Sequence, residues 1–448
     1  MLLVIALVLS VMTFGAFVTV PMTGVALLFI AKPVVDATWR ELLVAGMPLT
    51  QIVAGLVPLV VLGHMLTASK EAQLTRMPLW PLWLVYTVVL SLSVVQIIHG
   101  QDLRTGFSVL LRHMNGLVGF YMVQAFFRRE REIKLFLTAL IVAGIFPVGM
   151  GLFQLATGIV WQGEEQQIEG IIRNVGLYHD AITIRQYALQ TILSILLYVA
   201  LFPPQRLAGT AGLWAFAAFS LVVVSKAYSK AGLVILGLWA LSWTLLRRKL
   251  VVFIALLGIG AVVGAYLASS YLGEVLRIYQ KELGFLSGTV AADRTFNGRW
   301  YLWQEMLTEW GKLGTVAKVF GSGREALGAH NDYLQILFHG GLVGLALYLT
   351  LLASIGTMLV RNLMRRVDPL AVAGFMVFLA WMVDTIGLVP SAYSGYQWFS
   401  WGMIGLSLRV RQEEQQGFPL VEQIEPSSAI AAPALSAVSS RRFPLVSG

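Results

Sequence analysis

Long, uninterrupted apolar runs repeat along this sequence and limit it to one class of fold. Each run has roughly 17–25 residues, the length that a helix needs to cross the hydrocarbon core of a bilayer. The runs lack the short alternation of membrane β-strands, so the spans are predicted to be helices. Charged residues make up only 12% of the chain, about half their usual share in soluble domains. The sequence therefore predicts an all-α, polytopic membrane protein.

About twelve transmembrane helices are predicted from these runs. They cover 3–31, 41–67, 80–98, 105–127, 133–157, 182–203, 209–225, 230–246, 250–271, 337–360, 368–388 and 393–409. The first run contains Pro21 and is too long for one crossing, so a kinked helix and two half-helices both fit it. No Lys or Arg precedes its apolar part, and it is therefore not predicted to be a cleaved signal peptide.

Basic residues collect at the ends of particular spans and predict the orientation of the chain. The groups are Arg128, Arg129, Arg131 and Lys134; Arg247, Arg248 and Lys249; Arg361, Arg365 and Arg366; and Arg409 and Arg411. With twelve spans, all four groups fall on one side of the membrane. The positive-inside rule then places the N- and C-termini in the cytoplasm. These loops also explain the net charge of +9 without nucleic acid as a partner.

Two connections on the opposite face, about 158–181 and 272–336, are long enough to be functional. The longer one mixes acidic and basic residues evenly, and Trp300, Trp303 and Trp310 have a helical spacing suited to the membrane interface. We therefore expect a partly helical periplasmic loop. Residues 1–411 are predicted to form one transmembrane domain that includes this loop. Residues 412–448, rich in Pro, Ser, Ala and Gln, are predicted to be a disordered cytoplasmic tail.

The most specific motif lies where the longer loop meets the next span. His330 and Asn331 are followed by nine residues and then by Gly341-Leu-Val-Gly344. Several further segments accompany it in a fixed order. They are Arg173-Asn-Val-Gly176 in the shorter loop, Ser229-Lys230-Ala-Gly232, Asn297-Gly298-Arg299 with Trp303 four residues on, and the glycine-rich turn Val319-Phe-Gly-Ser-Gly323.

Over about 170–350 these segments resemble the O-antigen ligase and O-antigen polymerase superfamily. One departure is Lys230, which stands where the family often has the arginine of a Ser-Arg-Gly segment. Members of that family transfer a glycan from undecaprenyl pyrophosphate to a hydroxyl acceptor at the outer face of the bacterial inner membrane. The resemblance therefore implies a multi-pass inner-membrane protein with a periplasmic active site and no cofactor. The implied partners are the lipid-linked glycan donor, lipid A–core or a growing polysaccharide as acceptor, and membrane lipid.

The resemblance and elementary chemistry assign roles to three residues. Neutral imidazole is the natural base near pH 7, so His330 is expected to be the general base. Arginine is permanently charged and bidentate, so Arg299 and Arg173 are expected to bind the donor pyrophosphate. Displacement of that group by the acceptor would invert the anomeric centre. The chain has no Asp-x-Asp pair and no cysteine, so metal-independent transfer is expected, without disulfides or Cys-based metal sites.

Other assignments stay open on the sequence alone. Arg185, at the start of the next span, competes with Arg173 for the donor. Arg324 either contacts the donor or pairs with Glu325 beside it, and Lys230 either contacts a phosphate or extends its side chain toward the interface.

Polar residues near the histidine and within the spans have less definite roles. Asn331 and Asp332 are expected to support the site, with Asp332 or Asp293 orienting His330 or an arginine. His339 is expected to be a packed or hydrogen-bonded histidine of the apolar helix. Charges within spans are costly, yet the sequence assigns no role to three such residues, which are Arg112, His113 and Asp384.

The preferred function is O-antigen ligase-like transfer of a preassembled glycan onto lipid A–core. Within the superfamily, a polymerase that joins lipid-linked repeat units comes second and a protein O-oligosaccharyltransferase third. From a different class, about twelve helices also suit a secondary transporter. A transporter should show related halves and interrupted helices at matching places, and neither pattern is evident in the sequence.

Overall fold

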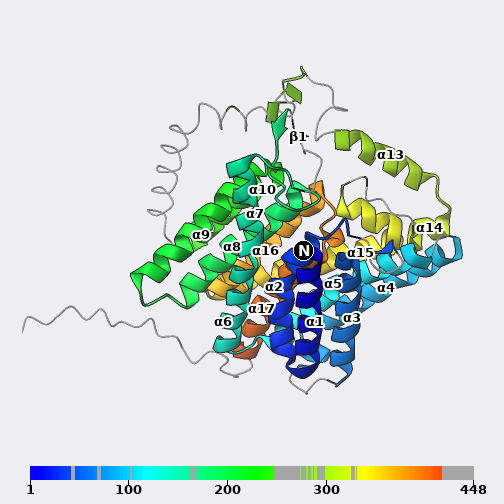
Figure 1. Ribbon diagram of the computed structural model, residues 1–448. Helices are drawn as coiled ribbons and strands as arrows, with labels where there is room; N and C mark the ends of the chain where they lie inside the picture. Colours follow the sequence, from blue (N-terminus) through cyan, green and yellow to red (C-terminus); the bar gives the residue numbers. More distant parts are fainter. Residues whose placement is uncertain are drawn as a thin grey trace, which may run out of the picture.

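The computed structural model describes residues 1–41, 46–67, 72–100, 103–161, 167–168, 170–246, 273, 279–280, 284–285, 287–289, 298–323, 328 and 330–415. Figure 1 shows this part of the chain as a bundle of helices, with a short strand pair and α13 at its upper end. The predicted span 250–271, most of the predicted tail, Asp293 and Arg324 lie outside the described residues.

Helices make up almost every element of the described chain. The first are α1 (Leu2–Thr19), α2 (Pro21–Asp36), α3 (Leu49–Thr67), the 3-10 helix η2 (Leu74–Arg76), α4 (Trp80–Gly100), α5 (Leu103–Phe126), α6 (Glu130–Ala143) and α7 (Ile145–Thr157). Two strands follow, β1 (Gln167–Ile168) and β2 (Ile171–Ile172), which pair antiparallel with Gln167 opposite Ile172. The remaining helices are α8 (Ala181–Leu201), α9 (Leu207–Lys226), α10 (Lys230–Leu246), α13 (Arg299–Gly311), α14 (Thr315–Phe320), α15 (Asp332–Arg365), α16 (Pro369–Gly387), η5 (Pro390–Ala392) and α17 (Ser394–Gln415).

Seven helical segments among the described residues are long and apolar enough to cross a membrane. They are α1, α3, α6 together with α7, α8, α9, α15 and α16. Side chains such as Val8, Val11 and Met12 of α1 are more than half exposed, as expected for a helix surface that contacts lipid tails. The prediction of an all-α chain with membrane-spanning helices is confirmed at this level. The count of twelve spans and the side on which each terminus lies stay predictions.

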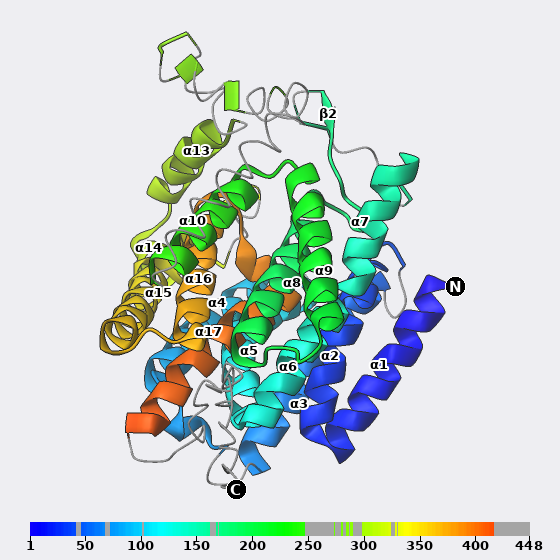
Figure 2. The same ribbon diagram turned by 90° about the vertical axis from the view of Figure 1, so that its left-hand side faces the viewer.

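The first predicted span consists of two helices, which is one of the two possibilities that its length left open. The backbone leaves the helical region at Val20, and Pro21 begins α2, a position where proline costs no hydrogen bond. The two helices lie side by side as a hairpin (Figures 1 and 2), and Gly24 permits this approach because a Cβ there would overlap the backbone of Phe17. The N-terminus of α1 and the C-terminus of α2 therefore lie at the same end of the hairpin.

Close packing of α5 against α17 forms the centre of the bundle. A Cβ at Gly119 would lie 2.7 Å from Trp398 Cα, and a Cβ at Gly402 would overlap Val123. Small residues at such contacts let membrane helices approach until their backbones pack, which is a main source of attraction between helices in lipid. The contact therefore depends on glycines from both helices.

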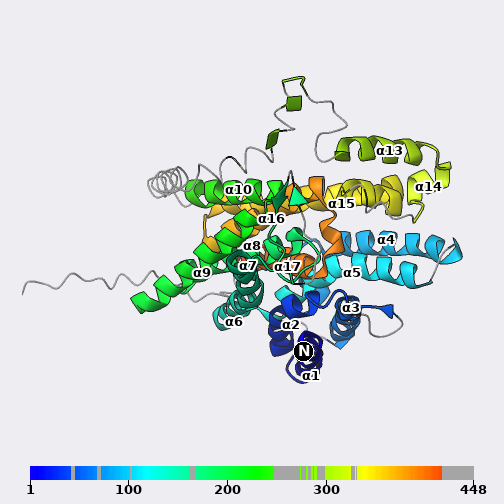
Figure 3. The same ribbon diagram turned by 45° about the horizontal axis from the view of Figure 1, so that its top comes forward.

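The described part of the long loop lies along the beginning of α15, where Figure 3 shows α13 and α14 beside that helix. α13 confirms the helix that the tryptophan spacing predicts over 300–310. Two of its tryptophans, Trp303 and Trp310, pack against Leu334 and Leu337 of α15, whereas Trp300 is 43% exposed. The apolar face of α13 thus holds this helix against α15.

The Gly-x-x-Gly motif marks a break within α15. Gly341 has φ 62° and ψ −160°, a region that is almost confined to glycine. The turn after α14 packs into this break, because a Cβ at Gly321 would overlap the carbonyl of His339 and a Cβ at Gly341 would overlap Val319. The two glycine-rich segments of the sequence are therefore in contact, and each needs glycine for the contact to form.

Candidate functional site

His330 lies at the start of α15, with an exposed side chain and a backbone φ of 46°. This left-handed region is uncommon for residues other than glycine, although histidine enters it more often than most. The next residue, Asn331, caps α15, since its Oδ1 accepts a hydrogen bond from Leu334 N at 3.1 Å. Its Nδ2 also donates to Ile386 O at 3.3 Å. Asn331 therefore links α15 to the end of α16 and holds the backbone that carries His330.

Asp332 connects two segments of the chain through buried hydrogen bonds. Its carboxylate is fully buried and accepts hydrogen bonds from Tyr348 Oη at 2.9 Å and from Ser391 Oγ at 2.6 Å. The bonds with these two hydroxyls hold its carboxylate in place, and Arg112 of α5 is close enough for its charge to act on Asp332. A role in orienting His330 stays a prediction. Because Ser391 belongs to η5, Asp332 joins α15 to the segment that carries Tyr393.

Arg299 is the first residue of α13 and is half-buried. Gly298 before it has φ 76° and caps the helix in the left-handed conformation. The guanidinium extends to the end of α16, where Nη1 lies 3.2 Å from the place that a Cβ of Gly387 would occupy. Since Ile386 beside this glycine also bonds Asn331, Arg299 and His330 meet at the same end of α16.

The Arg173 segment is held by a buried glutamine of α7. Gln154 Oε1 accepts from Val175 N at 2.9 Å and from Gly176 N at 2.7 Å, and its Nε2 donates to Arg173 O at 3.2 Å. The Arg173 side chain itself donates from Nε to Ala227 O at 2.9 Å, at the end of α9. No hydrogen bond joins the terminal nitrogens of this guanidinium to another described residue, and the loop that carries them is held in place by Gln154.

Asp180 and Tyr393 complete the cluster, although neither residue belongs to a motif of the sequence. Asp180 caps α8 by accepting from Thr183 N at 2.7 Å, and its Oδ2 accepts from Tyr393 Oη at 2.9 Å. An aspartate directly before an apolar run is a helix-start signal that could have drawn attention to Asp180. No such signal marks Tyr393, because its partner lies 213 residues away in the chain. We call Arg173, Asp180, Arg299, His330 and Tyr393 together the Arg–His cluster.

The surroundings keep His330 neutral. Loss of hydration lowers the pKa of His330 below its ordinary value of 6.5, and the nearby charge of Arg299 lowers it further. Asp180 opposes both effects. A histidine with a lowered pKa is unprotonated at pH 7 and can accept a proton.

Both arginines of the cluster stay charged. Burial lowers the pKa of Arg173 to about 10, with Asp180 acting in the opposite direction and Arg185 and Arg299 lowering it further. Burial also lowers the pKa of Arg299, which Tyr393 partly offsets. Two guanidinium cations and a neutral imidazole, from the two long loops of the chain, therefore meet at one end of the bundle.

Arg185 lies inside the bundle in a buried ion pair and is not a member of the Arg–His cluster. It is fully buried, and its Nη2 donates to both carboxylate oxygens of Asp384 at 2.8 Å while Nη1 donates to Ser229 Oγ at 3.1 Å. Gly232 permits this placement, because a Cβ there would lie 2.8 Å from Arg185 Cδ. The Ser-Lys-Ala-Gly segment thus surrounds a buried ion pair that gives Asp384 a partner. A donor contact of Arg185 stays a prediction.

The other predicted residues lie as follows. The ammonium group of Lys230 is 5.7 Å from the ring centroid of Tyr279, and Tyr279 Oη donates to Lys230 O at 3.3 Å.

Among the residues within spans, His113 Nε2 and His339 Nδ1 share a hydrogen bond of 2.9 Å between α5 and α15, and Gln335 also contacts His339. His339 is thus the hydrogen-bonded histidine that the sequence predicts. Arg324 lies outside the described residues, so its assignment stays a prediction.

Comparison with known proteins adds no assignment. No protein-family model matches the chain, and no curated protein matches it.

Proposed function

We propose that this protein is a glycosyltransferase of the O-antigen ligase type, which transfers a glycan from undecaprenyl pyrophosphate to a hydroxyl acceptor. The observation that carries the proposal is the convergence of Arg173, Arg299 and His330 at one end of the helical bundle. A transfer of this kind needs cations for the leaving pyrophosphate and a base for the acceptor. The cluster supplies both within a protein that has membrane-spanning helices, so the polyprenyl chain of the donor can stay in lipid.

The proposed step is a direct displacement. The acceptor hydroxyl oxygen forms the new bond to the anomeric carbon as His330 takes up the hydroxyl proton. The bond from the anomeric carbon to the pyrophosphate oxygen breaks, and the electron pair leaves with undecaprenyl pyrophosphate. Arg173 and Arg299 offset the negative charge that develops on the leaving group. The configuration at the anomeric carbon is inverted.

The cluster is proposed to face the periplasm of the bacterial inner membrane. The start of α6, which directly follows Arg128 and Arg129 in the chain, lies at the end of the bundle opposite α13, as does the end of α17 (Figures 1 and 2). By the positive-inside rule that end is cytoplasmic. The acceptor would then be lipid A–core in a ligase, or a growing lipid-linked polysaccharide in a polymerase.

Replacing the proposed base tests the function. We expect His330→Ala to lower transfer by about 10²–10⁴-fold, the range that a positioned base contributes. Transfer would be measured with purified protein and a polyprenyl-pyrophosphate glycan donor, and as banding of surface polysaccharide in cells that carry the variant. Full transfer by a correctly inserted His330→Ala protein would remove His330 as the base.

The pH dependence of the wild-type protein gives a second reading of the same residue. The pKa of His330 is lowered below 6.5 in the folded protein. The transfer rate should therefore stay high from pH 8 down to about pH 6.5 and fall only at lower pH, where His330 becomes protonated. A rate that already falls between pH 8 and pH 7 would contradict the assignment.

Cells that lack the protein distinguish the two acceptors, since loss of a ligase leaves long chains on the carrier lipid and loss of a polymerase leaves single repeat units on the surface lipid.

A further inference from the structure

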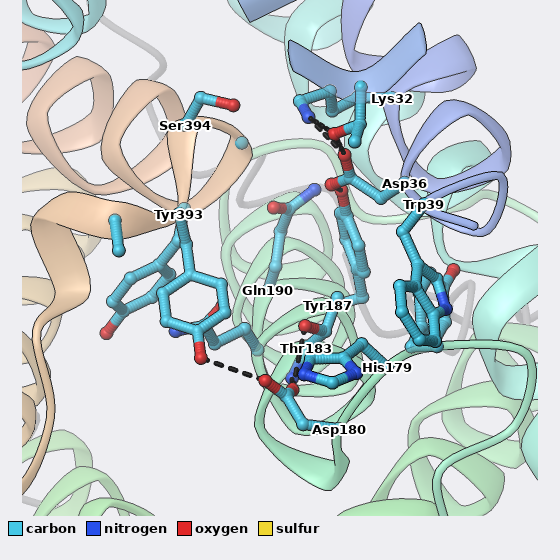
Figure 4. Close-up of a pocket in the computed structure, with 16 residues that line it drawn as sticks. Lys32, Asp36, Trp39, His179, Asp180, Thr183, Tyr187, Gln190, Tyr393 and Ser394 are labelled. Atoms are coloured by element: carbon cyan, nitrogen blue, oxygen red, sulfur yellow. Dashed lines mark hydrogen bonds and ion pairs between the residues drawn. The ribbon is translucent and has the colours of Figure 1, made fainter. Parts of the chain in front are cut away.

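A second group of polar and aromatic side chains adjoins the Arg–His cluster. It lines a partly open cavity of about 210 Å³ between the end of α2, the first turns of α8 and the segment 392–396. Asp180 and Tyr393 belong both to this cavity and to the cluster. Figure 4 shows their hydrogen bond on one side of the cavity and Asp36 with Lys32 on another. The two sites are therefore neighbours that share a wall.

Three donors in the wall of the cavity have no hydrogen-bond partner among the described residues. Trp39 Nε1 and Gln186 Nε2 are buried and unpaired. Gln190 is 4% exposed, and no hydrogen bond of its side-chain amide to the described part of the chain is found; Figure 4 shows this amide pointing into the cavity. Buried polar groups are nearly always paired in native proteins, so such a group of donors indicates a ligand with several acceptor atoms.

The acidic side of the cavity is already ordered. Asp36 accepts hydrogen bonds from Thr50 Oγ1 at 2.6 Å and from Tyr187 Oη at 2.5 Å, and it also pairs with Lys32, which is 2% exposed. These bonds hold the carboxylate and the tyrosine ring in fixed positions. A ligand can therefore bind without first ordering these side chains.

The charge of the lining excludes a second pyrophosphate site. Lys32 is the one Lys or Arg among the lining residues of this cavity, and Asp36 and Asp180 contribute two carboxylates. An anionic ligand would meet an excess of negative charge there. A neutral ligand rich in hydroxyl groups suits the lining better, because its oxygens can accept from the unpaired amide and indole donors and its hydroxyl hydrogens can bond the carboxylates.

Aromatic rings define the kind of neutral ligand. Trp39, Tyr187 and Tyr393 line the cavity. The Trp39 ring already contacts His179, centroid to centroid at 4.4 Å, and Arg40 at 4.9 Å, so the two tyrosines are the rings left to face a ligand. Sugar rings bind to flat aromatic faces through their C–H bonds and to planar amides and carboxylates through their hydroxyls. We propose that this cavity binds a sugar ring of the substrate, next to the pyrophosphate held by Arg173 and Arg299. This inference rests on the proposed function, because that function places glycans at this end of the bundle.

The sugar can come from either substrate, and direct binding measurements separate the two sources. The first probe is the core oligosaccharide released from lipopolysaccharide, which represents the acceptor. The second is the free repeat-unit oligosaccharide, which represents the donor glycan. Saturation-transfer NMR on the full-length purified protein should show binding of at least one probe. The probe that binds identifies the source.

Variants that remove single donors test the site. Gln190→Leu and Gln186→Leu remove an amide, and Trp39→Phe removes the indole N–H while keeping an aromatic ring. Each should weaken sugar binding by about three- to tenfold, the factor expected for one lost hydrogen bond. Gln51→Leu is the matched control, because Gln51 is exposed on α3 and lies outside the cavity lining. Three variants allow the test to proceed if one of them does not fold.

The outcomes separate this inference from the proposed function. Sugar binding that weakens in the three variants but not in Gln51→Leu supports the cavity, even if no transfer is found and the proposed function fails. Transfer by the wild-type protein without sugar binding, or with equal binding in all four variants, overturns the sugar site and leaves the proposed function intact. Absence of both sugar binding and transfer rejects both.

Discussion

Arg185 and Asp384 form a buried ion pair that joins α8 to α16, and Ser229 extends it to the start of α10. Both side chains are fully buried, so each charge depends on the other for compensation. Arg173 is close enough to Arg185 for their charges to interact. The pair therefore adjoins the Arg–His cluster and can position its wall.

Removing one partner of this ion pair should destabilise the folded protein. We expect Asp384→Leu to lower the free energy of unfolding by roughly 3–5 kcal/mol, because it leaves the Arg185 charge buried and unpaired. The double variant Arg185→Met/Asp384→Leu removes both charges and should recover most of that loss. Thermal unfolding in detergent measures both effects.

Activity of the double variant separates a positioning role from a binding role. If Arg185 only positions the cluster, a stable double variant should retain a measurable part of the transfer rate. A double variant that is as stable as the wild type but has no transfer would mean that Arg185 binds the donor directly.

At the scale of elements, the contact between the α14 turn and the break in α15 sets where His330 and Arg299 lie. The tryptophans of α13 pack against the first turns of α15. The turn at Gly321, after α14, packs against the break in α15. His330 comes nine residues after Gly321, directly before the capped start of α15. The glycine motif therefore acts through the backbone contact between the α14 turn and α15.

Substitution of Gly341 tests this interpretation. We expect Gly341→Ala to destabilise the protein by more than about 1–3 kcal/mol, the usual cost of strained backbone, because the added methyl group also overlaps Val319. Gly237→Ala is the control, since Gly237 lies in helical α10 and a Cβ there has no neighbour within 4 Å. Equal melting temperatures for the two variants would show that the contact at the break does not matter.

At the scale of the whole molecule, the α1–α2 hairpin changes the expected position of the N-terminus. Asp36 at the end of α2 lines the cavity beside the Arg–His cluster, and the start of α1 lies at the same end of the hairpin. α1 has 18 residues, about 27 Å of helix at 1.5 Å per residue, which is close to the thickness of the hydrocarbon core. If α1 crosses separately, every basic loop keeps its predicted side and only the N-terminus moves from the cytoplasm to the periplasm.

Cysteine labelling can decide this point, because the natural chain contains no cysteine. We expect a cysteine inserted after Met1 to react with a membrane-impermeant maleimide in intact spheroplasts, as should Gly328→Cys beside the cluster. Glu130→Cys and Arg206→Cys, both at exposed positions, should react only after lysis. If the inserted cysteine also required lysis, the N-terminus would be cytoplasmic, as the twelve-span topology predicts.

Much of the fold and part of the candidate site followed from the sequence. Hydropathy predicts α8, α9 and α16 because each helix is a local feature of about twenty apolar residues. The turn signal at Pro21 is also local, but it does not predict whether the second helix continues in line with the first or packs back against it. The convergence of Arg173, Arg299 and His330 agrees with the motif order, since the topology brings both long loops to one end.

The sequence by itself determined that this chain is helical and has helices long and apolar enough to span a membrane, because hydropathy acts over neighbouring residues. Only the tertiary structure decided that Arg185 is paired 199 residues away with Asp384 and that Tyr393 completes the cluster. It also decided that Lys32 and Asp36 line a cavity beside that cluster. Such contacts depend on how the helices pack, and packing of side chains from distant segments leaves no periodic pattern in the sequence.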